Sequence, residues 1–96
     1  MVDRETARQL VEKHVNERYT GSNGPLIVVD SSTREKPYGW VFFYCTKLWW
    51  ETRDIRYLLA GNGPIIFDAR TQRIHQLGTA THPDVQIRDW EAENWK

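Results

Sequence analysis

The sequence has one cysteine, one methionine and no long apolar run. Cys45 cannot form an internal disulfide. Its place in an apolar segment favours a small buried hydrophobic residue in a reducing compartment over a reactive or metal-bound thiol. No run approaches the ~20 apolar residues that cross a bilayer. Residues 1–5 are charged and lead into an amphipathic pattern, not a signal peptide. We therefore expect a cytoplasmic protein with no membrane partner.

An excess of charge of either sign is also lacking. Lys and Arg together number 13, as do Asp and Glu, so the formal net charge is zero. A protein that binds nucleic acid generally needs a basic face that neutralises phosphates. Neither half of the chain shows a basic excess of that kind. The charge balance therefore argues against nucleic acid as a partner.

Aromatic residues, by contrast, are abundant. The chain has 96 residues, of which five are Trp, and Phe, Trp and Tyr make up 12% of it. A chain of this length forms one domain, over residues 1–96, with a small core. Because such a core normally uses fewer aromatic residues, we expect some of them at the surface or at its edge.

The two ends of the chain predict helices. Asp3 is a suitable N-cap for the first helix, and residues 20–21 are expected to stop it. Its apolar face recurs at the helical spacing through Ala7, Leu10, Val11, His14 and Val15. Residues 83–91 begin with proline and predict a short terminal helix.

Between the helices the sequence predicts strands at residues 26–29, 38–45, 65–67 and 74–77. The first run is too apolar for a strand with one solvated face, so a central or doubly covered position is expected. Residues 31–37 are polar and predict a connection. The expected fold class is α+β, with the N-terminal helix packed on a mostly antiparallel sheet of about four strands and a short C-terminal helix.

A glycine-rich turn precedes the third predicted strand. Gly61, Asn62 and Gly63 tolerate positive φ, and Pro64 fixes the entry into the apolar run that follows. The turn lacks the Gly-Lys-Ser/Thr ending of a phosphate loop, and Pro64 removes a backbone donor that such a loop needs. We interpret it as a structural turn into a buried strand.

This turn belongs to a wider pattern that resembles a known family. Residues 39–42, 59–66 and 77–80 and the acidic, aromatic C-terminal segment are similar in order and spacing to the YrhB-like family, also called the immunity protein 35 family. The resemblance covers roughly residues 5–91. One glycine often found in the second hairpin turn is absent, since residues 70–73 read Arg-Thr-Gln-Arg. The motif residues are turn and core positions: Gly39, Trp40, Phe42, Gly61, Asn62, Gly63, Pro64, Asp68, Leu77, Gly78 and Thr79.

The resemblance implies a small bacterial domain that binds another protein. Many members of the family are encoded beside polymorphic toxins, and they resemble immunity proteins that block a cognate toxin domain without chemistry of their own. Some members stand alone, so the resemblance also permits a chaperone-like or stress-associated protein that binds unfolded clients through an apolar patch. Neither function implies a cofactor, and the family name identifies no toxin.

Residues that suggest catalysis or metal binding are few. No nucleophile-elbow sequence occurs, and the sequence cannot set the separation of Asp68 from Glu51 or Asp54 as paired carboxylates. We expect neither an enzyme nor a metal site. The soft metal ligands lack a paired ligand spacing: His14, His75, His82 and Cys45.

The candidate binding residues lie in the long connection over residues 47–60, where we expect one helical turn. Trp, Tyr and Arg are the types most enriched at binding hot spots, and five of them occur within nine residues: Trp49, Trp50, Arg53, Arg56 and Tyr57. At least one of the adjacent tryptophans should be exposed or cap the sheet edge. The alternative is a lipophilic loop folded over its own core. Trp90 and Trp95 form a second candidate among acidic residues.

Overall fold

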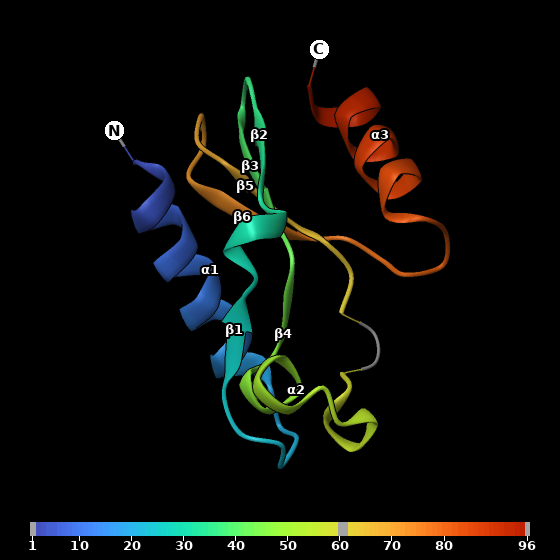
Figure 1. Cartoon of the computed structure of the whole chain (residues 1–96). Helices are drawn as coiled ribbons and strands as arrows, with labels where there is room; N and C mark the ends of the chain where they lie inside the picture. Colours follow the sequence, from blue (N-terminus) through green and yellow to red (C-terminus); the bar gives the residue numbers. More distant parts are fainter. Residues whose placement is uncertain (1, 60–61, 96) are drawn as a thin grey trace.

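A bent run of strand through residues 39–46 forms the axis of the fold (Figure 1). The computed structural model describes residues 2–59 and 62–95. β4 (Tyr44–Thr46) pairs with β1 (Leu26–Val28) in a two-stranded sheet, whereas β3 (Gly39–Phe42) lies inside a four-stranded sheet of order β2-β3-β5-β6. Every pairing is antiparallel. The remaining strands are β2 (Arg34–Lys36), β5 (Ile65–Asp68) and β6 (Arg73–Gln76).

Two helices cover opposite sides of the four-stranded sheet (Figure 1). Alternate residues of β3 and β5 point to opposite faces, and each face has its own buried cluster. α1 (Arg4–Arg18) packs on Phe42, Ile65 and Phe67. α3 (Pro83–Asn94) packs through Ile87 and Trp90 on a second cluster, which contains Tyr38, Val41 and Ile66. The predicted α+β class is confirmed.

α1 begins where the sequence predicts and ends slightly earlier. The Asp3 carboxylate accepts a hydrogen bond from the Thr6 backbone N–H at 2.8 Å, which is the predicted N-cap. The last helical residue is Arg18, two positions before the predicted stop. The buried stripe is narrower than the apolar pattern, because Leu10 is 42% exposed. Ala7, Val11 and Val15 are its buried members.

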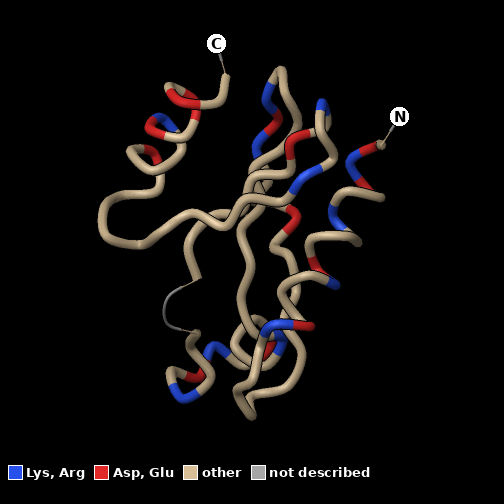
Figure 2. Tube along the Cα trace, turned by 180° about the vertical axis from the view of Figure 1, so that it is seen from behind, with Lys and Arg blue, Asp and Glu red and all other residues tan. Residues whose placement is uncertain are grey.

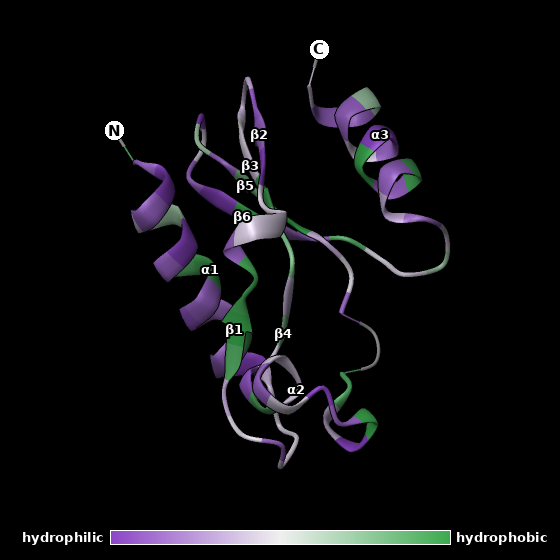
Figure 3. Cartoon of the chain, viewed as in Figure 1, coloured by the Kyte–Doolittle hydropathy of each residue, from purple (hydrophilic) through white to green (hydrophobic). Residues whose placement is uncertain are grey.

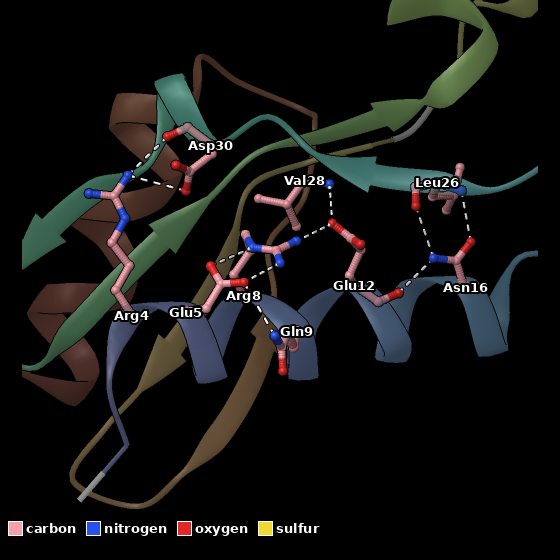
Figure 4. Close-up of polar contacts among 9 residues, drawn as sticks. All are labelled: Arg4, Glu5, Arg8, Gln9, Glu12, Asn16, Leu26, Val28 and Asp30. Atoms are coloured by element: carbon pink, nitrogen blue, oxygen red, sulfur yellow. Dashed lines mark hydrogen bonds and ion pairs between the residues drawn. The ribbon is translucent and has the colours of Figure 1, made fainter.

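The predicted central position of residues 26–29 is wrong, because β1 pairs with β4 alone. Side chains of α1 take the place of a second neighbouring strand (Figure 4). The Asn16 amide donates to the Leu26 carbonyl at 2.9 Å and accepts from its N–H at 2.7 Å. The Glu12 carboxylate accepts from the Val28 N–H at 3.0 Å. The N–H groups of Leu26 and Val28 and the Leu26 carbonyl are therefore satisfied without another strand.

Residues 31–37, predicted as a connection, contain a short 3₁₀ turn, η1 (Asp30–Ser32), and the edge strand β2. β2 was missed because its residues are polar and its first two are exposed. The run 38–45 is also less regular than predicted, since the strand is interrupted at Phe43. This interruption separates the part of the run that pairs with β2 and β5 from the part that pairs with β1.

The predicted hairpin of residues 65–77 is confirmed, with Asp68 opposite Arg73 across a four-residue turn. Gln72 adopts φ 57° there, so it supplies the left-handed conformation for which glycine is usual. Asp68 is 3% exposed. Its carboxylate accepts from the Arg70 N–H and binds the Arg70 guanidinium through two hydrogen bonds of 3.0 and 2.8 Å.

The glycine-rich turn holds three segments together. The Asn62 amide donates to the Tyr44 carbonyl at 2.9 Å, and the Leu77 N–H donates to the Pro64 carbonyl at 2.9 Å. A Cβ on Gly63 would collide with the carbonyl oxygens of Leu77 and Gly78, so this position excludes larger residues. The motif is structural, as predicted, but for a different reason: Gly63 does not have a positive φ, and it is required by the close approach of the neighbouring backbone. Gly61 lies outside the described residues.

Candidate protein-binding surface

Helix α2 (Lys47–Thr52) and the 3₁₀ turn η2 (Ile55–Tyr57) lie at the end of the molecule opposite the β5–β6 turn (Figure 1). Together with the residues between them and directly after η2, they contain all five predicted binding residues, and we call residues 47–58 the α2–η2 surface. The sequence predicted one helical turn in this segment. The structure has a six-residue helix followed by a 3₁₀ turn.

Thr46 connects α2 and η2 to strand β4 through hydrogen bonds. Its side chain is fully buried at the end of β4. The hydroxyl accepts from the Trp49 N–H at 3.0 Å as the N-cap of α2, and it donates to the Tyr57 carbonyl at 2.7 Å. One hydroxyl therefore begins α2 and positions η2.

The two tryptophans divide between interior and surface. Trp49 is half-buried, whereas Trp50 is 41% exposed, so the prediction that at least one is exposed is confirmed. Arg53 ends α2 in the left-handed conformation, with φ 57°, and its N–H donates to the Trp49 carbonyl at 2.7 Å. Its guanidinium carbon lies 4.4 Å from the Trp50 ring centroid and 5.6 Å from that of Trp49, which is cation–π geometry.

Arg56 is engaged within the surface itself. The Asp54 carboxylate accepts from the Arg56 N–H at 2.9 Å and forms three further hydrogen bonds with its guanidinium. These hydrogen bonds hold the pKa of Asp54 below its ordinary value. The guanidinium carbon also lies 5.6 Å from the Tyr57 ring centroid. Arg56 and Tyr57 therefore support η2, whereas Arg53 and Trp50 face outward.

The sequence interpretation missed two of the most exposed apolar side chains. Ile55 is 77% exposed and Leu58 is 54% exposed, and Figure 3 shows hydrophobic colouring in η2 and in the segment that follows it, beside hydrophilic colouring. Asp54 is the N-cap of η2 and Ile55 its first residue, but no local pattern in the sequence marks either apolar side chain as exposed. Trp50 in α2 is a third exposed apolar side chain of this segment, and Arg53 lies against its ring.

The other candidates have structural partners. Trp90 is 8% exposed and packs 5.0 Å from the Tyr38 ring, so it belongs to the core, whereas Trp95 is 39% exposed. The carboxylates of Asp54 and Asp68 each bind an arginine. Cys45 is 7% exposed, as predicted for a small buried residue, and burial raises the pKa of its thiol. Among residues 2–59 and 62–95, no three His, Cys, Asp or Glu side chains are grouped to hold a metal ion.

Comparison with known proteins gives a family and a relative. The model of a family described as immunity protein 35 matches residues 5–93. The uncharacterized protein YrhB of Escherichia coli K12 is 40% identical over 53 residues, which are 55% of this chain and 56% of that protein. No solved structure matches. In the described part of the chain no helix has the length and apolar character to cross a membrane. Since the family model spans nearly all of the sequence, the chain belongs to the immunity protein 35 family.

Proposed function

We propose that this protein is a non-catalytic immunity protein that binds a cognate bacterial toxin domain and blocks it by occlusion. Family membership supports a role as a protein-binding module. The observation that carries the proposal is the α2–η2 surface, where Trp50, Ile55 and Leu58 are each exposed within nine consecutive residues. Clusters of this kind, with an aromatic anchor and an adjacent arginine, are typical of binding hot spots.

The chemistry of the surface favours a partner with an apolar pocket and an acidic rim. Trp50 and Ile55 would enter the pocket, since a buried aromatic side chain contributes most to such an interface. Arg53 has no ion-pair partner among residues 2–59 and 62–95 and lies on Trp50. It would bind a carboxylate of the partner and help to select it against other toxins.

A chaperone-like function is the second candidate, because a protein that binds unfolded clients also needs exposed apolar residues. Ile55 and Leu58 meet that need, and Leu10 on α1 adds a third exposed side chain elsewhere on the molecule. The two functions differ in what they bind. An immunity protein binds one folded partner in fixed proportion, whereas a chaperone binds many unfolded chains weakly.

Affinity capture with the tagged chain from a lysate of its source organism distinguishes the two. We expect one partner in a fixed proportion, whose expression alone stops bacterial growth and whose effect is relieved when this chain is co-expressed. Growth that is inhibited equally with and without this chain would overturn the proposal. So would a diffuse set of proteins that increases after heat shock, which would support the chaperone-like function instead.

A further inference from the structure

The two edges of the β-structure differ in how far other parts of the chain cover them. On one side, α1 side chains bond to the backbone of β1, as described above (Figure 4). The neighbouring edge strand β2 is three residues long and is flanked by ion pairs with α3, from Arg34 to Asp84 and from Lys36 to Glu91. The hydrogen bonds to β1 and the charged side chains of the short strand β2 both disfavour the addition of another strand on this side.

β6 forms the opposite edge, and its outward backbone groups are open. The hydrogen bond from the Leu77 N–H to the Pro64 carbonyl fixes which residues bond to β5. Since bonding alternates along an antiparallel pair, Arg73 and His75 bond to β5, whereas the N–H and C=O of Ile74 and Gln76 point away from the sheet. In the described part of the chain, no hydrogen bond other than strand pairing reaches those groups.

A basic recess lies beside this open edge. Its volume is about 570 Å³, and it is lined by Asp68, Arg70, Thr71, Arg73, His75 and Asn94. The Asp68 carboxylate is bonded to Arg70, so its charge is already balanced. Arg73 is exposed and has no ion-pair partner among residues 2–59 and 62–95. The recess therefore offers an uncompensated positive charge, and Figure 2 shows basic positions around the β5–β6 turn.

We propose that the β6 edge is a docking site for an extended acidic segment of a partner protein. Such a segment would add a strand through the backbone groups of Ile74 and Gln76, which is a recurrent mode of peptide recognition. A Glu or Asp side chain of the segment would enter the recess and pair with Arg73. The backbone bonds supply affinity, and the recess supplies the preference for an acidic residue.

Charge complementarity favours this occupant over a second copy of the chain. If two β6 strands paired in antiparallel fashion about His75, each His75 would face the other, and Arg73 would lie opposite Leu77. That arrangement gives the recess no acidic partner. The inference is independent of the proposed toxin binding, because β6 and the α2–η2 surface are separate surfaces (Figure 1).

The test uses the isotopically labelled full chain and a synthetic peptide, Thr-Val-Glu-Val-Glu-Val-Thr. In the free protein, the amides of Ile74 and Gln76 should exchange faster than that of His75. Addition of the acidic peptide should shift the NMR signals of Ile74 and Gln76 and slow their exchange at least about fivefold. The matched peptide with Lys in place of Glu should give clearly smaller shifts at the same concentration, because its charges are repelled by Arg73.

Two variants test the recess. Arg73→Glu should weaken binding of the acidic peptide at least about fivefold, the effect of reversing one exposed charge. Arg88→Glu makes the same charge change at an exposed position of α3, and this variant should bind the acidic peptide as tightly as the unmodified chain does. Equal shifts with the two peptides, or shifts away from β6, would overturn the proposal. Inorganic phosphate that reproduces every change would show a small-anion site in place of strand addition.

Discussion

At the scale of single residues, the fold depends on positions where backbones approach closely. Gly39 lies in β3 opposite Asp68, and a Cβ built on it would collide with the Phe67 carbonyl oxygen. Gly78 is also a motif residue, but a Cβ there would lie 3.5 Å from the nearest Gln86 atom, an ordinary contact. Both glycines belong to the family motif, but only Gly39 is required by the close packing of the backbone.

Gly39→Ala should therefore lower the free energy of unfolding by about 3 kcal/mol, because the strand must shift to make room for the methyl group. Gly78→Ala is the matched control and should change it by less than about 0.5 kcal/mol. Denaturant titration of both variants checks this. Equal stability of the two would contradict the close contact between β3 and β5.

Asp68 makes a charged contribution that depends on pH. The hydrogen bonds from Arg70 hold the pKa of Asp68 below its ordinary value of 3.8. A carboxyl group whose pKa is lowered by folding stabilises the fold above its unfolded pKa, and this stabilisation is lost as the pH falls through the folded pKa.

Asp68→Asn should lower the free energy of unfolding by about 2 kcal/mol at pH 7, and this difference should shrink as the pH falls below about 4. Asp84→Asn removes an exposed carboxylate and should cost less than about 0.5 kcal/mol at pH 7. Unfolding measured between pH 7 and pH 3 tests this. A difference for Asp68→Asn that does not depend on pH would show that its charge is unimportant.

At the scale of elements, two polar side chains connect parts that lie apart in the sequence. Asn16 joins α1 to β1 through both of its amide atoms, and Thr46 joins α2 to η2 through its hydroxyl. In both cases a side chain satisfies backbone groups that no neighbouring strand or helix satisfies.

Asn16→Ala should lower the free energy of unfolding by about 2 kcal/mol, because the donor and acceptor of Leu26 both lose their partner. Gln9→Ala on the same helix removes one exposed hydrogen bond to Glu5 and should cost less than about 0.5 kcal/mol. Thermal or denaturant unfolding compares them. If the two variants are equally stable, the bonds of Asn16 do not hold β1.

Thr46→Val keeps the shape of the side chain and removes its hydroxyl, so α2 loses its N-cap and the Tyr57 carbonyl loses a donor. The expected cost is about 2 kcal/mol, with faster amide exchange at Trp49. Thr46→Ser keeps the hydroxyl and should keep the slow exchange at Trp49. Fast exchange in the serine variant as well would mean that the hydroxyl is not what fastens the α2–η2 surface.

The sequence predicted α1 and the start of β5 correctly, because residues close together in the chain mark both of them. Helical spacing and the Asp3 cap located α1, and the Gly-Asn-Gly-Pro turn located the start of β5. β2 escaped prediction because its polar residues suit an edge strand and a loop equally well. The edge position of β1 escaped it because its neighbours are the side chains of Glu12 and Asn16, which sequence periodicity does not identify.

The sequence predicted which residue types lie in the candidate site, but it did not predict how their side chains are arranged. The sequence placed Trp, Arg and Tyr in one segment, which the structure shows as two consecutive turns. The division of roles depends on hydrogen bonds and on which side chains face solvent. Asp54 engages Arg56, and Ile55 is more exposed than either tryptophan.

At the scale of the whole molecule, the two sides of the sheet are used by α1 and α3, so the surfaces open to a partner lie at the ends and edges. The α2–η2 surface occupies one end, and the β6 edge runs along the sheet (Figure 1). A partner that engaged both would need a folded pocket and an extended acidic segment. Each surface can be altered separately, since they share no residue.

In the proposed function, the α2–η2 surface binds the partner. The measurement that tests it most directly is the affinity of the captured partner for the unmodified chain, for Trp50→Ala/Ile55→Ala and for Leu10→Ala. Leu10 is as exposed as Trp50 but lies on α1. We expect the double variant to bind at least about 30-fold more weakly, since removal of one hot-spot residue costs 2 kcal/mol or more, and Leu10→Ala to bind normally. Equal affinity of all three proteins would show that the partner does not bind the α2–η2 surface.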